Sequence, residues 1–217
     1  MKNIVFLGPP ASGKGTQSKL LLQKKYDFIH IAAGDLLRDR ALQEDEFGTM
    51  IKNIIDNGNL VEDWVMLQVL EEKMKTVSKN QNIIFDGYPR KISQAQKLDE
   101  VLTKLGRKVD LVINLNIKDD AILERIEGRL MSRCGESYHE VYKKPVKEDI
   151  CDVCGQQLYK RKDDNKESFK QRIVNYYQIT SPLIQLYKER SLIRDVDALQ
   201  TIQKVGEDVE SIIKEYV

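Results

Sequence analysis

The chain has 217 residues, enough to bury a sizeable core as one domain without stabilisation by metals or disulfides. Its 35 basic and 34 acidic residues give a net charge of +1, so no field of the whole molecule attracts nucleic acid or an anionic membrane. No apolar stretch approaches the roughly twenty residues of a membrane span, and three cysteines, an odd number, do not form a secreted disulfide framework. We therefore expect a cytoplasmic monomer with no nucleic-acid or membrane partner.

The first predicted strand, Asn3–Leu7, leads directly into a glycine-rich segment, residues 8–16 (GPPASGKGT), that precedes a predicted helix. A loop that enters a helix points several unpaired backbone N–H groups at one spot, where the helix dipole also favours negative charge. Gly8 and Gly13 let the backbone approach a phosphate closely. The segment therefore predicts a phosphate-binding loop for a nucleotide triphosphate.

Side chains of this loop are suited to the same ligand. Lys14 can reach the outer phosphates as a point charge, and Thr16 supplies a hydroxyl near a magnesium ion. The usual motif has Ser or Thr directly after the lysine, whereas this chain has Gly15 there and the hydroxyl one residue later. The alternative interpretation is a glycine turn before an ordinary helix.

Further along the chain, apolar strand-like runs alternate with amphipathic helical stretches. The later runs are Phe28–Ala32, Asn82–Asp86, Leu111–Asn116 and residues 192–196. This alternation is typical of an α/β protein, so we predict a five-stranded parallel sheet flanked by helices. Between residues 128 and 164 the apolar residues thin out and all three cysteines gather, which predicts a small inserted subdomain.

The run Asn82–Asp86 ends in a carboxylate and is followed by a turn that carries Arg90. Because ligands in open α/β sheets bind beyond the carboxyl ends of the strands, we expect Asp86 to face the same crevice as the phosphate loop. A carboxylate there can hold magnesium-bound water, and a guanidinium can bind a second phosphate with two parallel hydrogen bonds. In isolation, the same residues also fit an ordinary turn with a solvated arginine.

Several other arginines are candidates for phosphate binding. They are Arg38, the pair Arg125 and Arg129, which we expect on one helix face, and Arg161 and Arg172, which flank the acidic pair Asp163 and Asp164. Each alone is more often a solvated surface residue. A phosphoryl-transfer site, however, needs positive charge around the moving group and at the far end of each substrate.

Taken in order, these motifs resemble the adenylate kinases, nucleoside monophosphate kinases of the long-lid type, over nearly the whole chain. The motifs are residues 13–17 (GKGTQ), 34–38 (GDLLR), 58–61 (GNLV), 86–90 (DGYPR), 94–95 (QA), Arg125 with 128–129 (GR), 161–164 (RKDD) and Arg172. The resemblance implies a P-loop kinase fold and a reversible, magnesium-dependent reaction in which ATP and AMP give two ADP.

The resemblance also implies a division of the chain into three parts. The core would comprise residues 1–31, 62–127 and 165–217, the monophosphate-binding subdomain residues 32–61, and a small β-rich lid residues 128–164. The lid would fold over ATP and keep water from the phosphoryl group.

The resemblance further implies roles for individual residues. Those near the transferred group would be Lys14, Asp86, Arg90, Arg129, Arg161 and Arg172. ATP would be bound by Ala11, Ser12, Gly13, Lys14, Gly15, Thr16, Arg125, Arg129 and Gln200. AMP would be bound by Ala33, Arg38, Asn59, Leu60, Val61, Gly87, Arg90, Gln94, Arg161 and Arg172.

Two departures from the family pattern concern the nucleotide sites. Ala11 stands where the loop usually has a further glycine, which strains the backbone if its φ is positive. Ala32 and Ala33 replace a Ser-Thr pair, and pyrimidine monophosphate kinases carry alanine at the position of Ala33. A UMP/CMP kinase is therefore the alternative within the superfamily, although Gln94 and the long lid favour AMP.

The third departure is in the lid, where zinc-bearing relatives have two Cys-x-x-Cys pairs. This chain has Cys134, Cys151 and Cys154 but lacks one ligand, and His139 is a candidate for the fourth position. The alternative is a metal-free lid held by hydrogen bonds and packing.

A function of another class is a nucleotide-dependent switch or a zinc-ribbon binding module. Such a protein would not need a second arginine-lined pocket, which Arg38, Arg90 and Gln94 would supply here.

Overall fold

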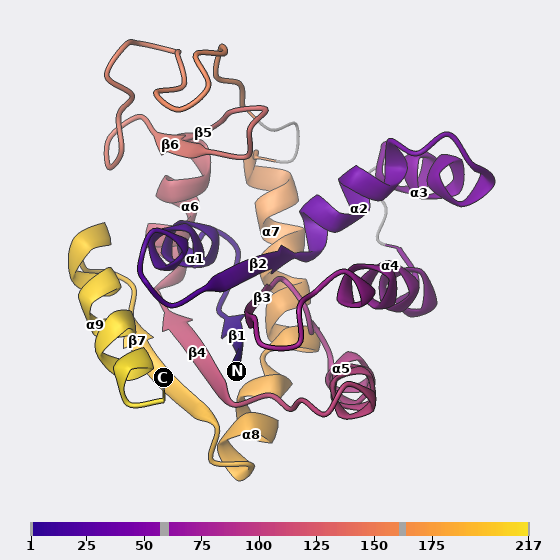
Figure 1. Ribbon diagram of the computed structural model, residues 1–217. Coiled ribbons are helices and arrows are strands. Elements are labelled where there is room, and N and C mark those ends of the chain that lie inside the picture. The colour runs from indigo at the N-terminus through magenta and orange to yellow at the C-terminus, as the bar shows by residue number, and fades with distance from the viewer. Residues whose placement is uncertain (1, 57–60, 161–163, 217) are drawn as a thin grey trace.

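The computed structural model describes residues 2–56, 61–160 and 164–216, and its centre is a parallel β-sheet (Figure 1). The strands are β1 (Asn3–Leu7), β2 (Phe28–Ala32), β3 (Asn82–Asp86), β4 (Leu111–Asn116) and β7 (Ile193–Asp197), in the spatial order β2-β3-β1-β4-β7. The prediction of a five-stranded parallel sheet is confirmed, with the last strand beginning one residue later than expected. Short apolar runs between helices form such a sheet because both of its faces are covered.

The strand order brings together the carboxyl ends of β1 and β3, where open α/β sheets have their ligand-binding crevice. The chain leaves the central strand β1 for β2 on one side, returns to β3, and then places β4 and β7 on the other side. Phe6 pairs in register with Asp86, so the loops that follow β1 and β3 emerge side by side. Ligands of open α/β sheets bind at this kind of position.

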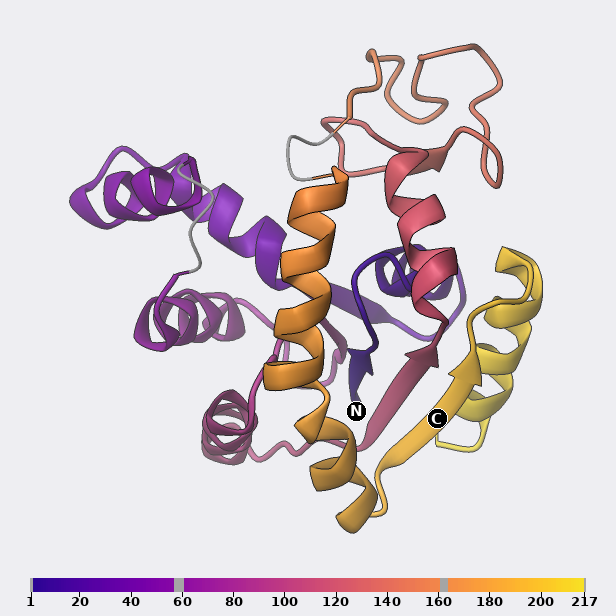
Figure 2. The ribbon, with the colours of Figure 1, turned by 180° about the vertical axis from the view of Figure 1, so that it is seen from behind.

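Two apolar clusters hold helices against the faces of the sheet (Figures 1 and 2). On one face, α1 (Lys14–Leu22) and α9 (Ile202–Lys214) contribute residues such as Leu21 and Val209. On the other face pack α4 (Asp63–Lys75), α5 (Ile92–Lys104) and α8 (Pro182–Glu189). Full burial of each large apolar side chain contributes about 1.5–3 kcal/mol, so this core anchors the crevice.

Residues 33–56 form two helices that project from the core, α2 (Ala33–Ala41) and α3 (Glu46–Asp56) (Figure 1). Their apolar faces meet α4 in a small cluster that includes Ala41, Ile51 and Val65. The guanidinium of Arg40 is buried and donates two hydrogen bonds of 2.8 Å to Asp45, which fixes the loop between the helices.

The cysteine-containing segment lies over the carboxyl end of the sheet, between α6 (Asp119–Glu127) and α7 (Lys166–Asn175) (Figure 2). It contains an antiparallel pair, β5 (Arg129–Met131) and β6 (Ser137–His139). The chain continues from α7 through a π-helical turn, η1 (Tyr176–Thr180), into α8. Within the described ranges, no helix is long and apolar enough to cross a membrane.

One detail of the sequence prediction is wrong at the entrance to this segment. Arg125 and Arg129 do not share a helix face, because α6 ends at Glu127 and Arg129 begins β5. The His139 ring packs against Gly128, where a Cβ atom would lie 2.4 Å from it. Only glycine leaves room for this ring at the point where the helix ends.

Candidate active site

The loop between β1 and α1 has three residues in the left-handed region. Gly8 has φ 136°, Gly13 has φ 101° and Ala11 has φ 56°. A Cβ atom on Gly8 would lie 2.7 Å from the carbonyl oxygen of Leu115, so only glycine fits there. Ala11 is thus in the strained conformation considered from sequence, at a cost of roughly 1–2 kcal/mol. The loop ends at Gly13, which precedes α1, and residues 14–16 lie in the first turn of this helix.

Lys14, the first residue of α1, folds back over this loop. Its Nζ donates hydrogen bonds to the carbonyl oxygens of Gly8 (2.8 Å) and Pro9 (2.7 Å). The pKa of Lys14 is lowered to about 8, chiefly by loss of water contacts and also by the positive charges of Arg90, Arg172 and Arg129, against the opposing effect of Asp86. Bound phosphate oxygens would replace the carbonyl contacts and restore the stability of the charged ammonium.

Asp86 ends β3 beside the start of α1. A Cβ atom on Gly15 would lie 3.5 Å from its Oδ2, so the glycine that departs from the general motif faces this carboxylate. His30, on β2, contacts the same oxygen through Nε2 at 3.3 Å. Burial raises the pKa of Asp86, but the His30 hydrogen bond and the Lys14 charge outweigh it, so the net pKa lies below the usual value. Asp86 is therefore ionised, and its carboxylate oxygens can act as ligands of a metal ion.

His30 is a site residue that sequence reasoning missed. The available signal was a histidine in an otherwise apolar strand, two residues before Ala32, whose partner in register is Asp86.

Residues predicted to bind AMP gather beyond β3. A Cβ atom on Gly87 (φ 72°) would lie 3.4 Å from a guanidinium nitrogen of Arg90 and 3.8 Å from the Cβ of Ala33. Nε of Arg90 donates to the carbonyl oxygen of Gly87 at 2.9 Å. Arg38, on α2, is half exposed and forms an ion pair with Asp35. This side of the crevice thus offers one guanidinium from the turn after β3 and one from α2.

Gln94 lies in the first turn of α5 and connects this group to α4. Its Oε1 accepts from the backbone N–H of Arg90 at 2.8 Å, and its Nε2 donates to Asp63 at 2.8 Å. Val61, also predicted at this site, packs against the apolar clusters of the core and of α2 and α3. Asp63 was not predicted from sequence.

On the opposite side, the carboxylate of Asp164 holds two predicted arginines. Arg129 donates to it from Nε (2.7 Å) and NH2, and Arg172 donates from NH1 at 3.5 Å. The Asp164 side chain is 1% exposed, so it is a desolvated counter-charge. It links the cysteine-containing segment to α7.

Arg125 and Gln200 lie near the loop that follows β7. Arg125 donates to the carbonyl oxygen of Ser12 at 3.4 Å and to that of Ala198 at 2.6 Å, so it joins the phosphate loop to the end of β7. Gln200 donates to Asp208 at 2.8 Å. The predicted residues Asn59, Leu60 and Arg161, and Asp163 of the acidic pair, lie outside the described residues.

The three cysteines form one cluster above the crevice. Their sulfur atoms lie within 4.8 Å of one another, and those of Cys134 and Cys151 are 3.7 Å apart. Zn–S bonds of about 2.3 Å in a tetrahedron place two sulfurs about 3.8 Å apart, so this spacing fits zinc. The buried Ser132 Oγ lies 3.1 Å from Cys154 Sγ and 3.4 Å from Cys134 Sγ.

His139 is not a member of this cluster, contrary to the prediction of a fourth ligand. Its Nδ1 accepts hydrogen bonds from the backbone N–H groups of Val141 (3.0 Å) and Tyr142 (3.2 Å), and its Nε2 faces the carbonyl oxygen of Glu124. Both ring nitrogens are thus used at the base of the segment. Ser132, in contrast, contacts two of the three sulfur atoms.

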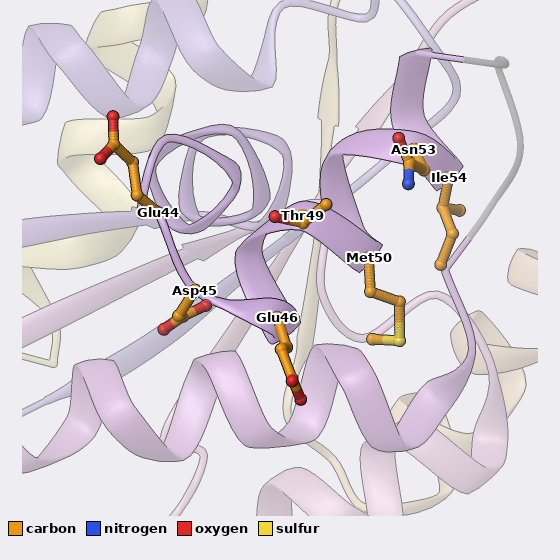
Figure 3. A pocket seen from close by; sticks show the side chains of 7 residues that line it. All are labelled: Glu44, Asp45, Glu46, Thr49, Met50, Asn53 and Ile54. Atoms are coloured by element: carbon orange, nitrogen blue, oxygen red, sulfur yellow. The ribbon is translucent and has the colours of Figure 1, made fainter.

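A surface hollow on α3 is chemically unlike the crevice (Figure 3). It is lined by Glu44, Asp45, Glu46, Thr49, Met50, Asn53 and Ile54. The three carboxylates and the absence of a basic side chain among these seven residues make it a poor site for phosphate. The crevice, with Lys14 and the arginines around it, is the candidate active site.

Comparisons with known proteins agree with this chemistry. The family model described as adenylate kinase matches residues 6–192. A protein named adenylate kinase from Methanosarcina barkeri is 37% identical over 99% of both chains. A protein of the same name from Caldicellulosiruptor bescii is 41% identical over 88% of both chains. Another, from Archaeoglobus fulgidus, is 38% identical over 98% of both chains.

Proposed function

Because this chain belongs to the adenylate kinase family, we propose that its crevice binds ATP and AMP and transfers one phosphoryl group between them, giving two ADP. The observation that carries the proposal is the placement of Lys14 and Arg90 after the neighbouring strands β1 and β3, with Arg129 and Arg172 held together by Asp164. The charges of Arg90, from the turn after β3, and of Arg129 and Arg172, from the opposite side, all act on the ammonium of Lys14. Such an arrangement suits a triphosphate and a monophosphate that meet end to end.

On this proposal, ATP lies over the β1–α1 loop. The backbone of residues 11–16 and the ammonium of Lys14 bind its phosphates, while Arg125 and Gln200 lie against its adenine. The contacts of Arg125 with the carbonyl oxygens of Ser12 and Ala198 support this placement, since they set the guanidinium between two loops that border the crevice. Arg129 gives up its ion pair with Asp164 and binds the phosphates instead.

AMP lies on the other side, between α2 and the end of β3. Arg38, Arg90 and Arg172 bind its phosphate, and the base meets Gln94. The remaining predicted contacts are Ala33, Val61, Gly87, Arg161 and the backbone of Asn59 and Leu60. The proximity of Ala33, Gly87 and Arg90 supports a common subsite.

No side chain acts as a covalent nucleophile, because a phosphate oxygen of AMP attacks the terminal phosphorus of ATP and ADP leaves. Catalysis then consists of positioning and charge neutralisation. Asp86 and Thr16 provide oxygen donors of the kind magnesium prefers and would hold it with its water shell. Bound there, the ion would neutralise charge on the ATP phosphates.

We further propose that residues 32–61 form the AMP-binding subdomain and residues 128–164 form a lid segment. Closure of the lid segment would exclude water and bring Arg129 and Arg161 to the phosphates. A zinc ion would be held in the lid segment by Cys134, Cys151 and Cys154, remote from the reaction, and would crosslink its two loops. The expectations of a cytoplasmic monomer without nucleic-acid or membrane partners stay predictions.

The decisive experiment is a coupled ADP-release assay with ATP and magnesium, in which AMP, CMP, UMP and GMP are compared as acceptors. We expect AMP to be preferred. Preference for CMP or UMP would identify a pyrimidine nucleotide kinase, and tight nucleotide binding without turnover of any acceptor would identify a switch.

Replacing Lys14 with Met is expected to lower kcat by about 10²–10³-fold, because it removes a preorganised charge from the transferred group. Arg90→Ala should raise KM for AMP and lower kcat. Circular dichroism and thermal melting should show intact folds. Turnover near that of the unsubstituted enzyme would contradict the role given to the residue concerned.

A further inference from the structure

The side-chain amide of Gln94 is held at both ends. The backbone N–H of Arg90 donates to Oε1, and Nε2 donates to Oδ1 of Asp63, each at 2.8 Å. A backbone N–H can only donate, and an ionised carboxylate can only accept. Rotation of the amide by half a turn would set donor against donor and acceptor against acceptor. The chemistry of its neighbours therefore fixes which way the amide points.

Asp63 is itself well anchored. It is the first residue of α4, pairs with Lys91 Nζ at 2.9 Å and accepts from Ser93 Oγ at 3.2 Å. Burial raises the pKa of Asp63, but hydrogen bonds from Lys91 and Gln94 lower it more, so the net pKa is below its usual value. The carboxylate thus stays an acceptor and joins the start of α4 to the start of α5.

We propose that Asp63 is a positioning residue that sets the acceptor specificity of the AMP site by fixing the amide of Gln94. This inference rests on the proposed function, in which Gln94 meets the base of AMP. Each end of an amide has two hydrogen-bonding positions, so one N–H of Nε2 and one lone pair of Oε1 remain for a base.

The fixed amide selects bases by the pattern of their donors and acceptors. Adenine offers the acceptor N1 beside a 6-amino donor, and cytosine repeats the pattern with N3 and its 4-amino group. Hypoxanthine and uracil have an N–H beside a carbonyl oxygen, which reverses it. A site whose polar groups are matched to one pattern disfavours the other, because its groups are then left unpaired. The acceptor class is therefore monophosphates of amino-bearing bases, with CMP preferred over UMP as well as AMP over IMP.

The test compares kcat/KM for AMP, IMP, CMP and UMP, with ATP and magnesium, in the unsubstituted enzyme and in variants. The ratios AMP:IMP and CMP:UMP each compare bases of the same ring size. Asp63→Ala should lower both ratios about tenfold, the effect of losing one hydrogen bond to a charged group. Asp63→Asn keeps an acceptor oxygen and should retain most of both ratios.

Lys91→Met is the matched control, because it removes the ion pair of Asp63 but leaves the hydrogen bond to Gln94. It should leave both ratios unchanged. The inference is overturned if Asp63→Ala lowers turnover of all four acceptors equally, or if Lys91→Met or Asp63→Asn lowers the ratios as far as Asp63→Ala does. It is also overturned, without any variant, if the unsubstituted enzyme does not prefer the amino-bearing member of each pair.

Failure of the proposed function has a different signature. In that case the unsubstituted enzyme would turn over none of the four acceptors, or Gln94→Ala would leave KM for AMP unchanged. A fall in both kcat/KM ratios in Asp63→Ala, with AMP turnover and the melting temperature largely retained, supports the proposed function and the role of Asp63.

Discussion

The central sheet and the lid segment are stabilised in different ways. Strand β1 is buried along its whole length, and large apolar clusters cover both faces of the sheet. In the described part of the lid segment, Tyr138, Cys151 and Leu158 form a small apolar cluster, and hydrogen bonds, ion pairs and sulfur contacts add to it. We therefore expect the central sheet, which carries the phosphate loop, and the lid segment above it to lose stability separately.

The largest effect is expected from truncation in the sheet. Phe6→Ala removes a side chain that is 1% exposed and should lower the free energy of unfolding by about 3–5 kcal/mol. Leu158→Ala, in the lid segment, should lower the global value by less than about 2 kcal/mol, because we expect this segment to open locally before the sheet unfolds. Denaturant unfolding combined with hydrogen exchange of residues 128–160 distinguishes the two. Equal global losses would mean that sheet and lid segment unfold as one unit.

A second test concerns Lys14, on the sheet side. Its pKa of about 8 means that the ammonium loses its charge well below the usual value of about 10.4, so kcat/KM for ATP should fall as pH rises through about 8. The unfolded chain keeps this proton to higher pH, so the contribution of Lys14 to stability rises with pH between these two values. A pH–rate profile and melting curves should thus move in opposite directions. Persistence of the inflection near pH 8 in Lys14→Met would assign it to another group.

A third test acts on the lid segment alone. Ser132→Cys adds a fourth sulfur beside the cluster and should raise zinc affinity at least about tenfold, whereas Ser132→Ala should not. Zinc content after dialysis against a competing chelator measures the affinity. In the Cys variant, hydrogen-exchange protection should increase in the lid segment but not in β1. Equal zinc content in both variants would show that the serine position does not face the ion.

The smallest expected effect is that of an ion pair that joins the two regions. Nζ of Lys19, on α1, lies 2.9 Å from Glu136, in the lid segment, and Glu136 also pairs with Lys143. A double-mutant cycle with Lys19→Met and Glu136→Gln should give a coupling of about 0.5–1 kcal/mol that declines at high salt. The pair Lys204–Asp208, within α9, is a control that does not link the regions. A coupling no larger than that of the control would show that the Lys19–Glu136 pair does not link the two regions energetically.

Much of the fold was predictable because its signals are local. The apolar runs that became β1 to β4 kept their bounds, since a parallel strand that is covered on both faces is a mostly apolar run. The placement of Arg129 was not predictable from its spacing to Arg125. The helix ends at Glu127, and Gly128, against which the ring of His139 from strand β6 packs, separates it from Arg129 in β5.

Polar partners within the crevice were also hard to foresee. His30 and Asp63 reach the site only through the register of β2 with β3 and the packing of α4 beside α5. His139 met the chemical requirement for a zinc ligand, but two backbone N–H groups occupy its Nδ1. Such pairings depend on tertiary geometry, which residue type and spacing do not specify.

The sharing of Asp164 by Arg129 and Arg172 has a thermodynamic consequence for nucleotide binding. These guanidiniums carry a protein carboxylate as their counter-ion, so in the proposed site a nucleotide phosphate would replace that carboxylate instead of ions from solution. Binding through them would then exchange one anion for another and release few salt ions. Its affinity should therefore vary less with added salt than that of a site whose cations face water.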